Sequence, residues 1–368
     1  MRILEITGEP ILHGGQENFI YNILENIENP DLKFDVMTPY NCENDKFREL
    51  IRSKGGKVYE LNLEFRPWKS RKLIYQPVLD FLRSQKYDVI HIHSGSISVL
   101  AYEAKAAKKA GIKKIIVHSH STGVKGLKHT LIQTAFSPLL KTYPNVYMAC
   151  SKEAGEMKFP RSVQNKVIVI KNGINIKRFE RNNTRGRELR EKYHIPDDAY
   201  VIGHVGRFTV EKNHSFLIDV FEKVNEAIPN SYLLLVGEGE LLEEIRMKAN
   251  TLKSPGNVIF TGVVDEPQDY YNAMSCFALP SLYEGFSFVT LEAQANGLPC
   301  LVSTGVPDAV IINRNIMRME LDSQKWAEYI LNHIGIRDAN YTNIKEIAQF
   351  DICIAAKEIE ELYMGNRK

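Results

Sequence analysis

Short apolar segments alternate with segments of helical periodicity along most of this chain. Residues 2–7 form an apolar run, a glycine loop follows, and apolar residues then recur at helical spacing from Phe19 to Ile27. Repeated βα units predict parallel sheets with helices on both faces, and such sheets bind ligands at the carboxyl ends of their strands. In the first half we expect further strands at 34–38, 58–61, 89–93, 114–119 and 166–170, and helices from residue 45, at 72–85 and at 99–110.

The alternation stops at the turn Asn172-Gly173 and starts again at Tyr200. Between them, the polar stretch 180–190 predicts an exposed segment near a domain boundary. With 368 residues, of which 44% are hydrophobic, the chain is long enough for two domains that each have a core. We therefore predict that a second α/β domain begins at residue 171. Its expected strands lie at 200–206, 233–236, 258–264 and 277–279.

Cysteine usage and hydropathy indicate the compartment. The five cysteines are far apart and form no Cys-x-x-Cys pair, which argues against a disulfide framework and against a zinc site. The amino terminus has no signal-peptide pattern, and no segment approaches the roughly 18 apolar residues that a membrane helix needs. We therefore expect a cytoplasmic protein that is neither exported nor membrane-spanning.

Positive charge is concentrated in one region. Residues 101–171 contain thirteen Lys and Arg against three acids, a net of +10, so that the rest of the chain carries −8 of the total of +2. Such a region can meet anionic lipid headgroups, nucleic acid or a phosphorylated substrate, and the alternative is a solvated basic face. Aromatic residues are too sparse there to suggest nucleic acid.

Two carboxylates stand out in the stretch from Leu279 to Val302. Glu284 follows an expected strand, and Glu292 falls in the next expected helix among apolar neighbours that leave it no obvious solvated face. A buried charge needs a partner, and a pair of ligand hydroxyl groups would be one. The alternative is that Glu284 is an ordinary loop carboxylate and that Glu292 pairs with a basic side chain.

Two cations occupy the start of the second domain. Arg207 and Lys212 lie between an expected strand and the next expected helix. This placement suits a diphosphate, because Arg can grip two oxygens while Lys acts as a mobile point charge, and the alternative is a pair of surface cations. Gly14-Gly15, ahead of the first helix, similarly favours an anion such as a phosphate. The turn Gly237-Glu238-Gly239 is an incomplete dinucleotide fingerprint, because Leu242 stands where a third glycine is required.

Four histidines fall near the ends of two expected strands. They are His91, His93, His118 and His120. The members of each pair are two residues apart, so both face the same side of the sheet. Metal ligation is one interpretation, but no carboxylate or cysteine lies between them, and histidines at strand ends often cap neighbouring carbonyls. We therefore expect no metal site.

The string Glu284-Gly285-Phe286 followed by Glu292 resembles the E-x7-E signature of retaining nucleotide-sugar glycosyltransferases of family 4. Gly206-Arg207 followed by Lys212-Asn213 is similar to that family's Gly-Arg…Lys-Gly motif, with Asn213 where glycine is commoner. The resemblance implies the GT-B fold, an α/β fold of two Rossmann-like domains facing across a cleft, with the carboxyl-terminal helix crossing back to the first domain. Residues 1–170 with 352–368 would then be the acceptor domain, and residues 171–351 the donor domain.

The resemblance also implies roles for individual residues. Arg207 and Lys212 would hold the donor diphosphate and stabilise the charge that grows on it. Glu284 would bind hydroxyls of the donor sugar, and Glu292 those of the ribose. His120 would contact the transferred sugar, with His118 as the competing candidate. Further donor contacts are implied for Gly14, Gly15, Gly237, Val264, Gly285, Phe286 and Ser287.

The implied activity is retaining transfer of a sugar from a nucleotide-diphosphate sugar, with a UDP-sugar as first choice, to a glycan or lipid-linked oligosaccharide. The pattern near Cys300 is similar to that of exopolysaccharide and capsule enzymes. We expect no cofactor and no metal, and peripheral contact of the basic region 101–171 with the anionic inner face of the membrane. The alternatives are an inactive GT-B subunit that supports a partner transferase and a sugar-nucleotide epimerase. A dinucleotide oxidoreductase is disfavoured because the first strand lacks the fingerprint.

Overall fold

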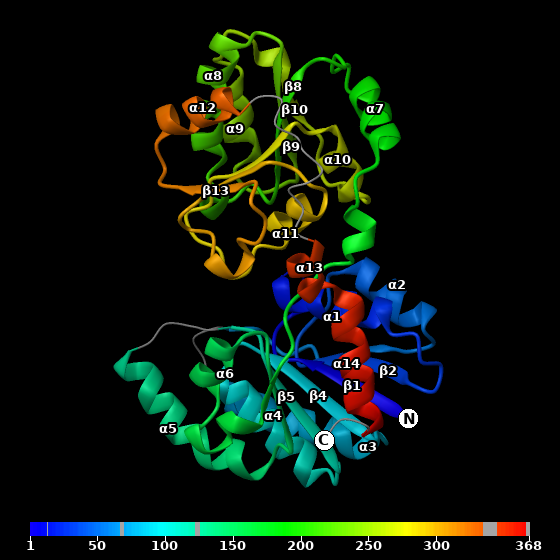
Figure 1. Ribbon diagram of the computed structural model, residues 1–368. Helices are drawn as coiled ribbons and strands as arrows, with labels where there is room; N and C mark the ends of the chain where they lie inside the picture. The colour runs from blue at the N-terminus through cyan, green and yellow to red at the C-terminus, as the bar shows by residue number, and fades with distance from the viewer. Residues whose placement is uncertain (13, 67–69, 122–125, 334–343, 366–368) are drawn as a thin grey trace. The chain divides into compact units, whose positions relative to one another are not determined.

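The computed structural model describes residues 1–368 except 13, 67–69, 122–125, 334–343 and 366–368. The chain divides into two compact units (Figure 1). The first unit contains residues 1–173 and 352–368, and the second contains residues 174–351. Each unit is built on a parallel β-sheet, and each is described by itself below.

The first unit has a seven-stranded sheet of order β3-β2-β1-β4-β5-β6-β7, in which every neighbouring pair is parallel. Its strands are β1 (Arg2–Thr7), β2 (Lys33–Thr38), β3 (Val58–Glu60), β4 (Val89–Ser94), β5 (Lys114–Ser119), β6 (Val146–Ala149) and β7 (Val167–Val169). Its longer helices are α1 (Gly15–Asn26), α2 (Asp45–Ser53), α3 (Tyr75–Ser84), α4 (Ile97–Lys109), α5 (Leu127–Thr142), α6 (Lys152–Lys158) and α14 (Ile352–Met364).

Strand alternation separates two cores on the faces of this sheet. Leu4 and Ile6 of β1 pack with α3 and α4 on one face. Ile3, on the other face, packs with α1, α2 and α14. Glu5 follows Ile3 at the two-residue period of a strand, so it points toward α1 and α14 rather than into solvent. It is buried there at 2% exposure.

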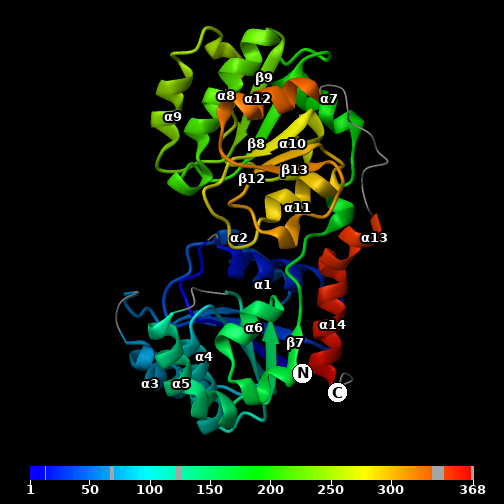
Figure 2. The same cartoon turned by 60° about the vertical axis from the view of Figure 1, so that its left-hand side comes forward.

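The carboxyl-terminal helix α14 belongs to the first unit, as the family resemblance implied (Figure 2). Its apolar face packs with α1 in one buried core. Glu360 holds the loop after α1 by accepting hydrogen bonds from the backbone N–H groups of Glu28 and Asn29 at 3.0 and 2.9 Å. Tyr363, near the end of α14, is fully buried and donates its hydroxyl proton to Glu5 at 2.7 Å.

The second unit has a six-stranded parallel sheet of order β10-β9-β8-β11-β12-β13. One face packs against α7, α10 and α11, and the other packs against α8, α9 and α12. Its strands are β8 (Tyr200–Val205), β9 (Ser231–Val236), β10 (Val258–Phe260), β11 (Cys276–Leu279), β12 (Cys300–Ser303) and β13 (Ile316–Met319). Its helices are α7 (Asn183–Lys192), α8 (His214–Ala227), α9 (Leu242–Ala249), α10 (Pro267–Ala273), α11 (Phe288–Ala295), α12 (Ser323–Asn332) and α13 (Ile344–Ile347).

Strand order defines one switch point in each sheet. In the first unit β1 lies between β2 and β4, and in the second β8 lies between β9 and β11. The connections leaving the two adjacent strands run to opposite faces at such a point, which opens a crevice at the carboxyl ends of the strands where ligands bind in open α/β sheets. The topology therefore predicts a ligand-binding site at the loops after β1 and β4 or at those after β8 and β11.

The polar stretch 180–190 is mostly exposed, as predicted, and it forms most of helix α7, which Asn182 caps through its side chain and which buries Leu189 against the second core. Its polarity reflects the outer face of that helix. Other elements differ from the prediction. The strand predicted to run through Val264 ends at Phe260. Helix α5 and strand β13 were not predicted, because neither has a strong periodic pattern of apolar residues.

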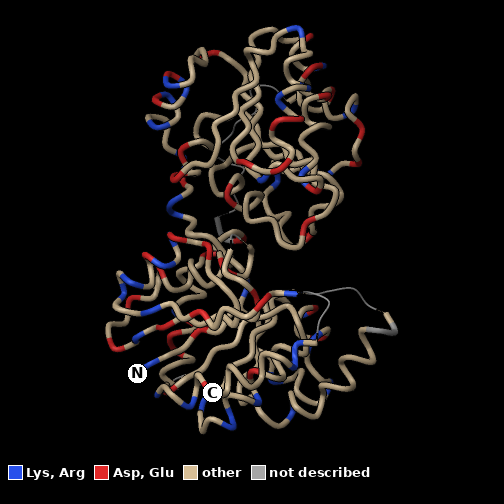
Figure 3. The backbone as a smooth tube through the Cα atoms, turned by 180° about the vertical axis from the view of Figure 1, so that it is seen from behind, with Lys and Arg blue, Asp and Glu red and all other residues tan. Residues whose placement is uncertain are grey.

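Most of the described lysines and arginines of the basic region 101–171 are exposed, but two lysines are engaged within the fold. Lys158 is buried at 5% exposure, and Lys114 donates to the backbone carbonyl of Tyr363 at 3.1 Å. Lys and Arg are spread over several elements of the first unit and are interspersed with acidic residues (Figure 3). Both findings reduce the charge that this region presents to an anionic surface.

Two further expectations concern cysteines and membrane helices. All five cysteines are free thiols, as their spacing predicted. In the described parts of the chain, no helix combines the length and the apolar character that crossing a membrane would require.

A buried carboxyl group in α4 yields a stability prediction. Glu103 is fully buried, and neither of its oxygens has a hydrogen-bond partner. Burial, followed by the nearby carboxylate of Glu9, raises its pKa well above the ordinary value. The folded state therefore binds a proton that the unfolded state releases, so this group contributes stability at low pH that is lost as pH rises above about 4.5. We predict that Glu103→Gln gains stability relative to wild type between pH 5 and pH 8, by more than about 1.4 kcal/mol, the value of one pKa unit.

Urea unfolding at both pH values measures this difference. The control is Glu49→Gln, which changes an exposed glutamate of α2 and should behave as wild type at both pH values. An equal stability difference between Glu103→Gln and wild type at pH 5 and pH 8 would contradict the assignment.

Candidate active site

Two loops meet at the switch point of the second sheet. The loop after β8 carries Arg207 and Lys212, and the loop after β11 carries Glu284. A backbone hydrogen bond ties them together, because Leu282 N–H donates to the carbonyl of Glu211 at 2.7 Å. Glu284 N–H is held by the carbonyl of Gly305, in the loop after β12, at 2.9 Å. The functional side chains are thus held by backbone geometry at the carboxyl edge of the sheet.

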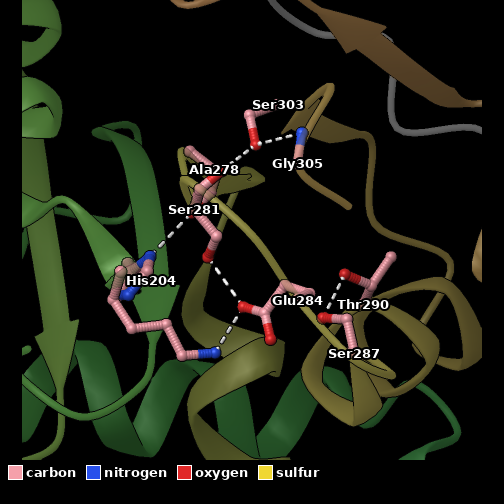
Figure 4. Close-up of polar contacts among 9 residues, drawn as sticks. His204, Ala278, Ser281, Glu284, Ser287, Thr290, Ser303 and Gly305 are labelled. Atoms are coloured by element: carbon pink, nitrogen blue, oxygen red, sulfur yellow. Dashed lines mark hydrogen bonds and ion pairs between the residues drawn. The ribbon is translucent and has the colours of Figure 1, made fainter. Parts of the chain in front are cut away.

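Lys212 and Glu284 form an ion pair. The Lys212 Nζ lies 2.6 Å from Glu284 Oε1, and the Ser281 hydroxyl donates to the same oxygen at 2.7 Å (Figure 4). The two charged side chains are only 20% and 11% exposed. Because the pair is largely desolvated, each charge depends on the other, and an isolated charge here would be costly.

Asn213 explains why the lysine is placed as it is. It has φ +54° and ψ +46°, the left-handed conformation, between the short turn η4 (Val210–Lys212) and the first residue of α8. Glycine adopts this conformation at no cost, and asparagine is among the residues that tolerate it best. The asparagine in place of the commoner glycine therefore preserves the loop geometry.

Arg207 is placed differently from Lys212. Its side chain is 71% exposed, and its guanidinium lies 3.8 Å from Glu240, a contact that surface screening makes weak. The arginine is therefore free to move toward an incoming anion from the same end of β8 that carries the lysine loop.

Glu292 has the partner that its burial requires, but the partner is not a base. The hydroxyl of Tyr271, from α10, donates to Glu292 Oε2 at 2.7 Å. Burial raises the pKa of Glu292 to about 7, while Tyr271, Arg178 and Lys212 act to lower it. The carboxyl group can therefore gain or lose a proton near neutral pH.

The Gly237-Glu238-Gly239 turn packs against the loop after β8, which carries Arg207 and Lys212. Gly237 has φ +136°, and a Cβ atom there would lie 2.2 Å from the carbonyl oxygen of Gly206. This close approach allows Phe208 N–H to donate to the carbonyl of Glu238 at 2.9 Å. The visible role of Gly237 is thus to let the β9 loop pack against the loop that carries Arg207. Val264, also predicted to contact the donor, lies partly exposed in the loop after β10.

The remaining predicted donor contacts follow Glu284. Gly285 is exposed and Phe286 is partly buried against Phe288, with ring centroids 5.0 Å apart. Ser287 precedes α11, and its buried hydroxyl is hydrogen-bonded to that of Thr290 at 2.8 Å. Its side chain is therefore already engaged within the fold (Figure 4).

In the first unit, Gly14 and Gly15 begin α1, but an acidic side chain lies across them. Glu17 is buried, and its carboxylate accepts hydrogen bonds from the backbone N–H groups of Gly14 and of Glu17 itself. This is the reciprocal half of a capping box, and a carboxylate is favourable at a helix amino terminus. An anion binding at this loop would meet that charge, a feature that the Gly-Gly pair alone did not reveal.

The four histidines lie on the α1 and α14 face of the first sheet, where a carboxylate that is distant in the sequence lies next to two of them. Glu5 of β1 accepts from His93 Nε2 at 2.6 Å and lies 3.3 Å from His91 Nδ1. Glu5 and His93 are 88 residues apart in the sequence, and they meet because β1 and β4 are neighbours in the sheet. His118 is fully buried, whereas His120, just beyond β5, is partly exposed.

Three of these histidines lie close enough together to be candidate metal ligands. Within the described residues, His91, His93 and His118 form a group whose ligand atoms lie within 4.8 Å of one another. His93 already uses both ring nitrogens, one with Glu5 and one with His120 at 2.9 Å. The remaining two histidines offer fewer ligands than a zinc site uses, so we interpret the group as core histidines, of which His91 and His93 are hydrogen-bonded and His118 is not.

Comparison with known proteins defines the class. The model described as Glycosyltransferase Family 4 matches residues 13–178, and the model described as Glycosyl transferases group 1 matches residues 199–335. HepE of Anabaena, whose crystal structure is in complex with UDP, is 19% identical, has a TM-score of 0.75, and aligns over 99% of this chain and 100% of its own. The fold is therefore GT-B.

Curated relatives place the chain further. The putative glycosyltransferase EpsF of Bacillus subtilis (strain 168) is 28% identical over 333 residues, 86% of this chain and 84% of EpsF. UDP-Gal:alpha-D-GlcNAc-diphosphoundecaprenol alpha-1,3-galactosyltransferase of Escherichia coli is 24% identical over 77% of this chain and 76% of its own. Capsular polysaccharide biosynthesis glycosyltransferase CapM of Staphylococcus aureus is 34% identical over 54% of this chain and 56% of its own. The chain therefore contains a Glycosyltransferase Family 4 domain followed by a Glycosyl transferases group 1 domain, and it is related to glycosyltransferases of exopolysaccharide and capsule biosynthesis.

Several residues around the site escaped the sequence analysis. Tyr271 and Glu17 are hydrogen-bonded to predicted residues, yet each looks like an ordinary helix residue in the sequence. Glu5 could have been singled out, because a glutamate inside an otherwise apolar strand is unusual.

The Tyr271–Glu292 hydrogen bond gives a prediction about pH. In wild type the Glu292 carboxyl group should titrate near pH 7. The Tyr271→Phe variant keeps the ring but loses a donor to the charged form, so it should raise the Glu292 pKa above that value. Carboxyl ¹³C chemical shifts in glutamate-labelled protein, assigned with Glu292→Gln, measure both.

A second tyrosine–glutamate pair provides the control. Tyr283 donates to Glu211 at 3.0 Å on the surface of the same unit. Tyr283→Phe should leave the Glu292 titration unchanged. Titration of Glu292 near pH 4.5, or the same pKa in Tyr271→Phe as in wild type, would contradict the assignment.

Proposed function

We propose that this glycosyltransferase transfers a sugar, with retention of anomeric configuration and without a metal ion, from a UDP-sugar to a glycan or lipid-linked oligosaccharide. The observation that carries the proposal is the Lys212–Glu284 ion pair at the carboxyl edge of the second sheet. A cation and a carboxylate held together at a switch point match the two chemistries of a sugar nucleotide, a diphosphate and a set of hydroxyls. The Anabaena HepE structures with UDP and with UDP-glucose support the choice of nucleotide.

In this proposal the bound donor replaces the contact between Lys212 and Glu284. The diphosphate attracts Lys212 away from Glu284 and also attracts the exposed Arg207. As the bond between sugar and phosphate breaks, negative charge grows on the leaving diphosphate, and fixed cations stabilise it more than they stabilise the bound donor. Two cations thereby supply the charge that a metal ion would otherwise supply.

Release from Lys212 gives Glu284 its own function. Once the lysine has turned to phosphate, the carboxylate can accept hydrogen bonds from sugar hydroxyls near the carbon where positive charge develops. The Ser281 hydroxyl, which donates to Glu284 Oε1, keeps the carboxylate in place during the exchange. Binding of the diphosphate and alignment of the sugar are then coupled through one pair of side chains.

Glu292 is proposed to bind the ribose. Two neighbouring hydroxyls would each donate to its carboxylate, which favours the ionised form and lowers the raised pKa of the unliganded group. The tyrosine hydroxyl on the same carboxylate fixes its orientation. From the first unit, we propose that His120 contacts the transferred sugar.

Two observations support the proposed acceptor: the names of two relatives and the basic residues of region 101–171. The Escherichia coli relative is named for a diphosphoundecaprenol-linked sugar, and the Staphylococcus aureus relative for capsular polysaccharide. We propose a lipid-linked glycan acceptor at the inner face of the membrane, met through the exposed lysines and arginines of residues 101–171. The two lysines of that region that point inward leave this contact weaker than the sequence implied.

Turnover of uridine-, guanosine- and adenosine-diphosphate sugars, with membrane lipid extract as acceptor, tests the proposal. We expect one nucleoside diphosphate to be released together with a sugar-sized mass gain on lipid, and the activity to persist in EDTA. Glu284→Gln should lower kcat/KM by about 10²- to 10³-fold, the scale for losing one electrostatic contact to a transition state.

The matched control changes a carboxylate that also pairs with a lysine. Glu226 forms an exposed pair with Lys253 at 2.7 Å elsewhere in the second unit, so Glu226→Gln should keep wild-type activity. If no donor is consumed, the chain is better explained as an inactive subunit that supports a partner transferase. Conversion of the donor sugar without transfer would instead indicate an epimerase.

A further inference from the structure

A continuous chain of hydrogen bonds crosses the first unit from α14 to the end of β5. Tyr363 donates to Glu5 Oε1 at 2.7 Å, and His93 Nε2 lies 2.6 Å from Glu5 Oε2. On its other side, His93 Nδ1 lies 2.9 Å from His120 Nε2. Four residues from three strands or strand ends and one distant helix are joined in this way, and we call them the Glu5 network.

Donor and acceptor accounting fixes the direction of each hydrogen bond. Burial lowers the pKa of His93 to about 3 and that of His120 well below its ordinary value, so both rings are neutral and each carries one N–H. If His93 carries its proton on Nε2, it donates to the Glu5 carboxylate and presents a lone pair at Nδ1. His120 must then donate from Nε2 and keep a lone pair at Nδ1.

The opposite direction satisfies the residues less well. It requires a protonated Glu5 that donates to His93, and it leaves His120 with an N–H at Nδ1, a buried atom that has no partner. A buried donor without an acceptor is costly. An ionised Glu5, by contrast, receives two strong donors and lies 3.3 Å from His91. Burial raises the Glu5 pKa, whereas His91 and the Tyr363 hydrogen bond lower it.

His120 Nδ1 is where this network ends. Both oxygens of Glu5, both nitrogens of His93 and Nε2 of His120 have partners, whereas His120 Nδ1 has none. It lies just beyond the carboxyl end of β5, the edge at which open parallel sheets bind ligands. A lone pair at this position accepts a hydrogen bond from a hydroxyl and cannot donate one.

We propose that Glu5 and His93 are positioning residues that hold His120 in the Nε2–H tautomer, so that its Nδ1 accepts a hydrogen bond from a hydroxyl of the bound sugar. The tautomer rests on the network alone, whereas the sugar contact rests on the proposed function. Tyr363 gives α14 a part in this arrangement, because its hydroxyl holds the carboxylate that orients His93. The return of the carboxyl-terminal helix to the first unit thus contributes to the site as well as to the core.

Nitrogen NMR of the full-length protein with ¹⁵N-labelled histidine tests the tautomer without any substrate. The chain has ten histidines, and the His120 signals are identified by their loss in His120→Asn. We expect wild-type His120 to carry its proton on Nε2. In His93→Phe, which removes the acceptor, and in Glu5→Gln, which keeps the volume, we expect a second population with the proton on Nδ1. His93→Gln keeps an acceptor oxygen and should restore the wild-type tautomer at least in part.

His118→Phe is the matched control, because His118 lies on β5 just before His120 and is fully buried, but neither of its ring nitrogens is hydrogen-bonded to any member of the network. It should leave the His120 tautomer unchanged. A wild-type His120 protonated on Nδ1, or an unchanged tautomer in both His93→Phe and Glu5→Gln, would overturn the positioning role.

Kinetics test the sugar contact. UDP contains no transferred sugar, so its affinity should be the same in wild type and Glu5→Gln. The kcat for transfer should fall about 5- to 30-fold in the variant, the scale of one weakened hydrogen bond, with little change in KM. If the variants show the expected change of His120 tautomer but kcat is unchanged, the sugar contact is overturned while the tautomer assignment stands. An inactive wild type with the expected NMR spectra would refute the proposed function and, with it, the sugar contact, but not the network.

Discussion

The contact between Lys212 and Glu284 depends on the parallel pairing of β8 with β11. The two residues are 72 positions apart, and they meet because adjacent parallel strands end at the same edge of the sheet. At 20% and 11% exposure the pair is largely removed from water, so neither charge can leave the other without a replacement. A ligand with both an anionic and a hydroxyl-bearing part is such a replacement. The chemistry proposed for this site follows from that requirement.

The two units differ in how they stabilise the polar side chains near the carboxyl ends of their strands. In the second unit, charged side chains are paired and partly accessible, which suits exchange with a charged ligand. In the first unit, the Glu5 network joins the neutral imidazoles of His93 and His120 to a single buried carboxyl group, which suits the orientation of a polar contact. Glu17 adds a second difference, since it covers the start of α1 with a carboxylate. The unit that we propose to bind the diphosphate is thus the one that carries Lys212 and Arg207 at a strand end.

The sequence was sufficient for the architecture and for the residues at strand ends. Apolar runs of strand length, glycine turns and helical periodicity predicted the parallel sheets. Glu284, Lys212 and Arg207 could be placed because each lies in a connection that follows a strand. The asparagine at position 213 was also compatible with the motif, for a reason visible only as its left-handed φ.

The partners of these residues could not be predicted in the same way. Glu5 reaches His93 because β1 is the neighbour of β4, and strand order is not written in local periodicity. Tyr271 reaches Glu292 from a different helix, and the polarity of α7 disguised a helix that buries only one narrow face. Each of these contacts depends on how helices and strands that are distant in the sequence pack together, and local sequence patterns do not reveal that packing.

The most direct measurement of the central idea is calorimetric titration of UDP into wild type, Lys212→Met and Glu284→Gln. If the donor diphosphate takes the lysine from the carboxylate, Lys212→Met should lose at least about tenfold in affinity, the scale of one charge-assisted hydrogen bond. Glu284→Gln should bind UDP at least as tightly as wild type, because the lysine is no longer held by a carboxylate. Equal losses in the two variants, with both still folded, would show that the ion pair is structural and would contradict the account.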